Sequence, residues 1–291
     1  MFDKLKGTQR SSVDDGRYSD SGTRPPSYVE AEHSRPQYSD EEDQQRYSSQ
    51  NESLSNAECS ASLPTPSTFA SVSLHMSDRL RFLQLPRPVI AQIRSRISHP
   101  EIWPRGIQEE RQYHGSWEIK LRGNPWHPTG NDAIYARRLT REVIATLYSL
   151  GWILYSSTDI SRKTNDKDNL FFRFQPRPPP TVPVEWFSLT FSRGDRLRLI
   201  DCPAELRQAI VAALAYKTQS HGPYRIPGVY ELKFTGHPFM ALGGESMDAR
   251  LLVLKLLDVL QRGGWRVYAS IDQKYGGENA NETDTWQICQ N

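Results

Sequence analysis

The sequence predicts an α+β fold made of a duplicated unit, with a mostly antiparallel sheet and helices packed on one sheet face. Three observations point to this fold. The segment GWILYSSTD (151–159) is echoed 113 positions later by GWRVYASID (264–272). A stretch with apolar residues at every third or fourth position precedes each copy, which is typical of a helix. Short links separate the strand-like runs, and short links favour antiparallel neighbours.

The duplication extends well beyond these nine residues. Without a gap, residues 117–159 and 230–272 are identical at 14 of 43 positions. Further upstream, DRLRFLQLP (78–86) echoes DRLRLIDCP (195–203). Because the matches fall in one register, we interpret the chain as two copies of one folding unit. Each unit is expected to run strand, helix, strand, loop, long helix, strand and strand.

The elements of the first copy follow from their residue patterns. Residues 78–86 form the first expected strand, and apolar residues at 89, 93 and 97 indicate a short helix. WEIKLRG (117–123) is strand-like and continues into the loop GNPWHPTG (123–130). An apolar stripe then predicts a long helix over 136–150, and Gly151 suits the left-handed position that ends a helix. Alternation from Trp152 onward and the run LFFRF (170–174) predict two more strands.

The second copy repeats this order. FSLTFSRGDRLRLID (187–201) is typical of a hairpin that turns at Arg193 and Gly194. A short helical pattern follows, and YELKFTG (230–236) is the next expected strand. The loop GHPFMALG (236–243) and a helix over 249–263 precede Gly264, the counterpart of Gly151.

Composition and the internal repeat together divide the chain into three parts. Residues 1–74 carry 7 Lys and Arg against 12 Asp and Glu, whereas residues 75–291 carry 29 against 22. The first part is rich in Ser and Pro and poor in branched apolar residues, so we expect a disordered acidic tail over 1–74. The first repeat is expected over 75–180 and the second over 181–291. The mildly basic body does not indicate nucleic-acid binding.

Cysteine content and hydropathy indicate the compartment. Cys59, Cys202 and Cys289 are far apart and outside any CxxC spacing, so neither a disulfide framework nor a metal site is expected. The opening MFDKLKGTQRSS lacks the apolar run of a secretory signal, and no apolar stretch is long enough to span a membrane. We therefore expect a protein of the cytoplasm or nucleus that uses no cofactor.

Several strings of the body carry a resemblance to a known group of proteins. WPRGIQEER, WEIKLRGNPW, the Gly-Trp pair, STDISRK and DKD occur in this order. Over roughly residues 78–291 the chain resembles fungal proteins that share this two-copy body. The resemblance implies no established activity, substrate or catalytic residue.

The tail contains the short motif that gives the clearest indication of a binding function. RPPSYVEA (24–31) includes Pro25, Pro26 and Tyr28 in a PPxY arrangement, which fits WW domains because the prolines favour a polyproline II shape and the tyrosine fills its own pocket. Such domains occur in HECT-type ubiquitin ligases, among other proteins. RPQY (35–38) has only one of the two prolines. Ser39 precedes four acidic residues, which suits an acidophilic kinase, although a solvated charge run explains the same pattern.

The loops before the long helices are the candidate ligand sites of the body. Arg137 and Arg250 fall in the first turns of these helices, where free amides, the helix dipole and a guanidinium could hold an anion. Trp126 lies in the first of the two loops. The alternative is a purely structural role: each loop is a tight turn, and each arginine forms a salt bridge with Glu118 or Glu231 of the adjacent strand.

Two functional hypotheses follow. The first is a non-catalytic interaction or adaptor protein whose tail binds a WW-domain partner. The second is a small-molecule or anion-binding protein, or an enzyme, with a site between the two repeats lined by Trp126, Arg137 and Arg250. Standard catalytic signatures such as GxSxG, HExxH and GxxxxGK[ST] do not occur in the sequence. The first hypothesis is therefore preferred, and the sequence gives no oligomeric state.

Overall fold

The computed structural model describes residues 68–158, 160, 169–176, 183–272 and 282–291 of the 291-residue chain. Pro25, Pro26, Tyr28 and Ser39 lie outside the described residues. Both repeats lie in one compact unit, Thr65–Asn291.

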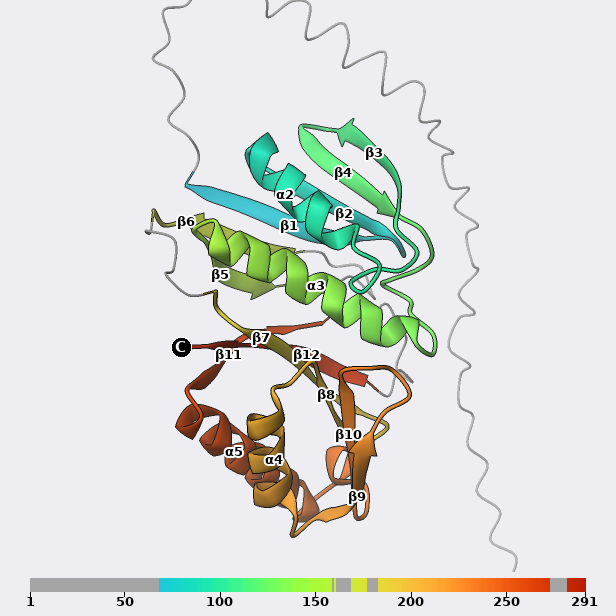
Figure 1. The fold of residues 1–291 in the computed structure, drawn as a ribbon, viewed down its shortest axis with the longest axis vertical. Helices are drawn as coiled ribbons and strands as arrows, with labels where there is room; N and C mark the ends of the chain where they lie inside the picture. Colours follow the sequence, from blue (N-terminus) through green and yellow to red (C-terminus); the bar gives the residue numbers. More distant parts are fainter. Residues whose placement is uncertain (1–67, 159, 161–168, 177–182, 273–281) are drawn as a thin grey trace, which may run out of the picture. The chain divides into compact units, whose positions relative to one another are not determined.

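The first repeat forms a six-stranded sheet, called sheet A here, with two helices (Figure 1). Its strands lie in the order β3-β4-β2-β1-β6-β5, and all the pairs are antiparallel. The elements in chain order are β1 (Phe69–His75), β2 (Arg79–Leu83), α2 (Arg87–Ile97), β3 (Ile107–Tyr113), β4 (Ser116–Leu121), α3 (Asp132–Ser149), β5 (Trp152–Thr158) and β6 (Asn169–Phe174).

The second repeat forms a second six-stranded sheet, called sheet B. Its strand order, β11-β12-β7-β8-β10-β9, is the order of sheet A read in reverse, strand for strand. The elements are β7 (Trp186–Ser192), β8 (Arg196–Ile200), α4 (Ala204–Leu214), β9 (Thr218–Pro223), β10 (Val229–Phe234), the 3-10 helix η1 (Pro238–Met240), α5 (Glu245–Arg262), β11 (Trp265–Ile271) and β12 (Glu282–Gln290). The predicted α+β fold and its duplication are confirmed, and the two copies do not share one sheet.

The cores explain why the strands alternate. In β1, Ala70, Val72 and Leu74 are buried and face α2 and α3, whereas Phe69 and the residues between them point to the other face of sheet A. In the second repeat α4 and α5 cover one face of sheet B in the same way. Helix α3 differs from α5 because it also contacts the opposite face of sheet B, through β7.

The first repeat begins upstream of the boundary that composition indicated. Strand β1 starts at Phe69, inside the segment 1–74 assigned to the tail. Its pairing with β2 and β6 supplies the hydrogen bonds that hold FASVSLH in the sheet. Composition missed it because the neighbouring serines and prolines dilute an apolar alternation of only three residues.

Two turn predictions are confirmed by the backbone. Arg193 and Gly194 have φ angles of 54° and 72° between β7 and β8, as a tight hairpin turn requires. Gly151 and Gly264 have φ angles of 83° and 78° two residues beyond the ends of α3 and α5, where a residue with a Cβ atom is strained.

Candidate functional site

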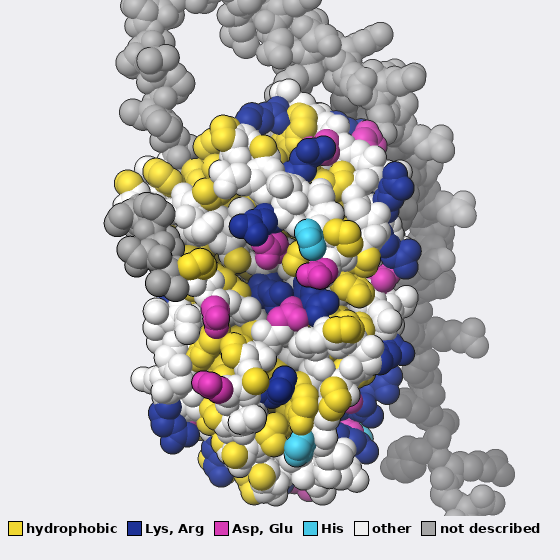
Figure 2. All heavy atoms as spheres, viewed as in Figure 1, with side chains coloured by type: hydrophobic (Ala, Val, Ile, Leu, Met, Phe, Trp, Pro, Cys, Tyr) yellow, Lys and Arg dark blue, Asp and Glu magenta, His cyan; other side chains and the backbone are white. Residues whose placement is uncertain are grey.

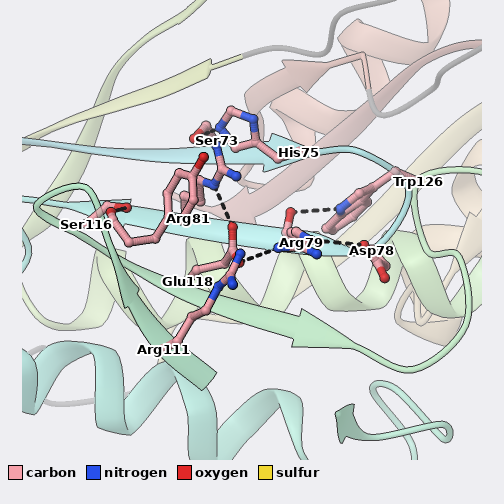
Figure 3. Close-up of polar contacts among 10 residues, drawn as sticks. Ser73, His75, Asp78, Arg79, Arg81, Arg111, Ser116, Glu118 and Trp126 are labelled. Atoms are coloured by element: carbon pink, nitrogen blue, oxygen red, sulfur yellow. Dashed lines mark hydrogen bonds and ion pairs between the residues drawn. The ribbon is translucent and has the colours of Figure 1, made fainter. Parts of the chain in front are cut away.

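The outer face of sheet A, opposite α2 and α3, carries a cluster of charged side chains around Glu118 (Figure 3). Glu118 lies on β4, and its side chain is only 1% exposed. Arg79 and Arg81 of β2 donate to its two carboxylate oxygens at 2.6 and 2.7 Å, and Arg111 of β3 donates at 2.9 Å. The register of β2, β4 and β3 brings these residues together, because Arg81 and Arg111 pair with Glu118 from either side.

The arginines hold Glu118 in its charged form. Burial alone raises the pKa of Glu118, but hydrogen bonds from Arg81 and Arg111 outweigh this effect and keep the pKa below its ordinary value. The guanidinium of Arg81 also lies 4.0 Å from the ring centre of Tyr113. A carboxylate bound by three donors is a poor proton acceptor, so this geometry favours a structural role over acid–base chemistry.

The second repeat repeats the cluster with one arginine fewer. Arg196 and Arg198 of β8 donate to Glu231 of β10 at 2.6 and 2.7 Å. The residue opposite Glu231 on the neighbouring strand is Gly222, where sheet A has Arg111 opposite Glu118. The cluster around Glu118 therefore carries one more positive charge than the cluster around Glu231.

A third ion-pair group joins the two repeats. Asp201, directly after β8, accepts two hydrogen bonds from Arg138 of α3, at 2.8 and 2.7 Å, and one from Arg141 at 2.7 Å. The side chains of both arginines are at most 10% exposed. Burial raises the pKa of Asp201, but the hydrogen bond from Arg138 and the charge of Arg141 bring it below its ordinary value.

An aromatic group lies at the same junction. Tyr148 of α3 meets Trp186 of β7 edge to face at 5.5 Å and Tyr268 of β11 at 5.4 Å, and the last two meet at 5.0 Å. The hydroxyl oxygen of Tyr268 accepts a 2.7 Å hydrogen bond from the backbone N–H of Leu154. Burial raises the pKa of Tyr268 to about 12, so this hydroxyl stays neutral.

The three residues proposed as a ligand site are not gathered at one place. Trp126 is fully buried in the core of the first repeat, and its indole N–H donates to the carbonyl of Arg79. Arg137 is buried and donates to the carbonyl of Ala133 in its own helix. Arg250 is exposed and donates to the carbonyl and hydroxyl oxygens of Ser246. The partners of Glu118 and Glu231 are the strand arginines described above, in place of the helix arginines considered from sequence.

Two hollows are relevant to the proposed ligand sites. One of about 340 Å³ lies where the repeats meet, lined among others by Arg96, Arg141, Glu142 and Trp186. Another of about 620 Å³ lies beside the first half of α5 and is mostly apolar. Its lining includes Pro238, Phe239, Arg250, Val253 and Leu254. In Figure 2, hydrophobic side chains lie exposed over the part of the surface that carries α4 and α5.

The described residues offer little metal or thiol chemistry. Within the ranges given above, no three His, Cys, Asp or Glu side chains gather closely enough to hold a metal ion. Cys202 and Cys289 are unbridged and buried. Burial raises the pKa of Cys202 to about 12 and also raises the pKa of Cys289, so both thiols stay protonated. Among the described helices, none is long and apolar enough to cross a membrane.

Comparison with known proteins supports the duplication. A protein-family model for a single domain matches the chain twice, over residues 68–173 and 185–289. The chain belongs to this family. The two matches coincide with the two repeats of the structure, and together they cover more than half of the chain.

Other comparisons are more distant. No curated protein matches the chain significantly. Among solved structures, the chain is similar to a conserved kinetoplastid-specific protein from Trypanosoma cruzi, with 12% sequence identity and a TM-score of 0.26. That match covers 37% of this chain and 94% of the other.

Sequence reasoning missed the arginines that hold the strand carboxylates. A signal was present, because DRLR occurs in both copies with two arginines at i and i+2, on the same face of a strand. It missed Asp201 because this residue bonds to the other repeat, which a single copy cannot reveal. It also missed Tyr148, whose partners are 38 and 120 positions away.

Proposed function

We propose that the chain is a non-catalytic interaction protein. Its tail would bind a WW domain through Pro25, Pro26 and Tyr28, and its duplicated body would bind a protein surface. The observation that carries the proposal for the body is the exposed apolar face of α5. Met247, Leu251 and Leu254 are 58%, 48% and 58% exposed on one side of this helix. Exposed apolar patches of this kind often mark protein–protein contacts.

The charged groups of the body support the same proposal. The carboxylates of Glu118, Glu231 and Asp201 are bound to arginines of the chain itself. Side chains that neutralise one another in this way stabilise a scaffold. They provide no poised base or nucleophile, so we favour binding over catalysis.

The proposal also specifies the partner of the tail, the compartment, a phosphorylation site and the source of the chain. We expect the WW-domain partner to be a protein such as a HECT-type ubiquitin ligase, met in the cytoplasm or nucleus. Phosphorylation of Ser39 would add negative charge eleven residues after Tyr28 and is expected to tune binding of the tail. We expect protein rather than nucleic acid as the partner of the body, and a fungal source for the chain.

The tail proposal is tested by a pull-down of the full chain with an isolated WW domain. Tyr28→Ala removes the ring that fills the tyrosine pocket and should abolish binding. Tyr38→Ala is the matched control, because RPQY lies in the same acidic segment but has only one of the two prolines. Binding that is undiminished in Tyr28→Ala, or equally reduced in both variants, would contradict the proposal.

A small-molecule or anion site is the second candidate. It is favoured by the hollow of about 620 Å³ beside α5, which Arg250 and apolar side chains line. This hollow lies within the second repeat, whereas the sequence-based hypothesis put the site between the repeats. Thermal-shift measurements with a panel of apolar carboxylates test this candidate, since Arg250→Ala should remove any stabilisation that depends on the guanidinium.

A further inference from the structure

One side of helix α5 is exposed and apolar over much of its length. Met247, Leu251, Leu254 and Leu257 are 58%, 48%, 58% and 36% exposed. They follow one another at intervals of four and three residues, which places them on one side of the helix. The buried residues of α5 lie on the opposite side, in the core of the second repeat. We call the four exposed residues the α5 stripe.

The equivalent side of α3 is an interface between two copies of the folding unit. The first three residues of the α5 stripe correspond to Ile134, Arg138 and Arg141 of α3. Ile134 packs in a buried cluster with residues of the second repeat, and the two arginines bind Asp201 of that repeat. The folding unit can therefore use this side of its long helix to pack on another copy of itself. In α5 the same side is exposed, and leucines replace the two arginines.

The α5 stripe lies where exposed apolar side chains are most concentrated. Of the thirteen large apolar side chains that are exposed in the described ranges, six lie between Met240 and Leu257. The mostly apolar hollow of about 620 Å³ adjoins the stripe, because Leu254 lines it together with Phe239 and Val253. A two-fold axis brings every feature of such a surface opposite the same surface of a second copy, so exposed leucines of one copy can enter the hollow of the other. This arrangement favours a contact between identical surfaces.

Two opposite charges lie on the same side of α5 as the stripe. Arg250 and Asp258 are both exposed, four residues before and four residues after Leu254. Within the described ranges neither takes part in an ion pair, and the acceptors of Arg250 are the neutral carbonyl and hydroxyl oxygens of Ser246. Antiparallel pairing of two α5 helices about Leu254 brings Arg250 of each copy to Asp258 of the other. Parallel pairing would instead place each charge opposite its own equivalent.

We propose that the α5 stripes of two copies of this chain pack against each other, antiparallel, in a two-fold symmetric dimer. Leu254 lies at the centre of the contact, and an ion pair between Arg250 and Asp258 closes it on either side. The inference rests on the proposed role of the body as a binding module, and it names the partner as the same chain. Because both copies use the same surface, the contact is isologous and the assembly closes at two copies.

Variants of the full chain that alter only exposed side chains test the dimer. Leu254→Arg places two guanidinium groups at its centre. Asp258→Arg and Arg250→Asp each reverse one charge, and a double variant exchanges the two. Arg96→Asp is the matched control, because it reverses a charge on α2 whose side chain is 71% exposed. Sedimentation velocity over a wide concentration range measures association, and circular dichroism confirms that each variant is folded.

The dimer predicts a specific pattern of association. The wild type and Arg96→Asp dimerise in a concentration-dependent way, whereas Leu254→Arg stays monomeric. Asp258→Arg and Arg250→Asp each weaken association roughly 10-fold or more, since either reversal sets like charges opposite each other twice. An equimolar mixture of these two variants forms heterodimers, and the double variant recovers most of the wild-type association, because both arrangements bring opposite charges together again. Added salt weakens the recovered association.

Three results overturn the proposal. They are a wild type that stays monomeric, a dimer that persists in Leu254→Arg, and folded charge-reversal variants that fail to associate when mixed. Binding of an isolated WW domain is measured on the same proteins and reports on the tail alone. A monomeric chain that binds the WW domain overturns the dimer and leaves the proposed function of the tail intact. A dimeric chain that does not bind the WW domain overturns the function of the tail and leaves the dimer intact.

Discussion

Helices α3 and α5 are both 18 residues long and occupy equivalent places in the two repeats. Twelve residues of α3 are buried, against four of α5. The difference arises because α3 lies between two sheets, whereas α5 covers only one. Duplication has therefore copied the contact of each helix with its own sheet. The opposite side of each helix has diverged with its surroundings.

The largest expected difference between equivalent positions is at Asp201 and Gln84. Asp201→Ala leaves Arg138 and Arg141 without their carboxylate in a site where both are nearly buried, and should cost about 3 kcal/mol of unfolding free energy. Gln84→Ala at the equivalent position removes no carboxylate from a pair of buried arginines and should lower the free energy of unfolding by less. Urea unfolding monitored by tryptophan fluorescence measures both. An equal loss of unfolding free energy in both variants would contradict the stabilising role assigned to the contact between Asp201 and α3.

A smaller difference is expected at Tyr148 and Gln261, which are equivalent near the ends of α3 and α5. Tyr148→Ala removes two edge-to-face contacts and the cover over Trp186 and Tyr268, and should cost about 2 kcal/mol. Gln261→Ala, on the exposed side of α5, should stay within about 0.5 kcal/mol. The same unfolding measurement applies, with Tyr148→Phe as the control that keeps the ring. If Tyr148→Phe lowers the free energy of unfolding as much as Tyr148→Ala does, the stabilisation comes from the hydroxyl group and not from the ring contacts.

The same comparison shows what sequence could and could not predict. The repeat, the α+β class, the hairpin at Arg193 and Gly194, and the helix ends at Gly151 and Gly264 were visible, because local patterns and turn chemistry determine them. The partners of Glu118 were not visible, because they depend on which strands are neighbours and in which register.

The sequence also did not predict that a second side of α3 is buried, the side that lies against sheet B. Its stripe of Leu139, Val143 and Leu147 predicted one buried face and left Arg137 as a candidate ligand for an anion. The structure buries Arg137, which donates to the carbonyl of Ala133 in its own helix. It also buries Arg138 and Arg141, because sheet B lies against the polar side of the helix, and Asp201 binds both of them. An arginine can be buried in this way when a carboxylate is supplied by a distant part of the chain, and the periodicity of one helix carries no trace of that partner.

The smallest expected effect is a pH dependence that Asp201 has and Gln84 lacks. The pKa of folded Asp201 lies below its ordinary value of 3.8, since the hydrogen bond from Arg138 and the charge of Arg141 outweigh the effect of burial. The stabilisation is therefore complete above the pKa of the unfolded chain, near pH 4, and is lost as pH falls through the folded pKa. Glu118, whose pKa is also lowered, makes a second contribution to the free energy of unfolding that is lost in acid, and this one does not involve the junction of the repeats.

Asp201→Asn separates these two contributions. The variant should be less stable than the wild type at neutral pH, and the gap should narrow below about pH 4, as the wild-type carboxyl becomes protonated. The remaining acid sensitivity of the variant is then assigned to Glu118 and other carboxyls inside the repeats. Unfolding free energies measured from pH 2 to pH 7 for both proteins test this assignment. A gap that stays constant down to the lowest pH would mean that Asp201 stabilises the junction by its shape and hydrogen-bonding capacity, and that its charge contributes nothing.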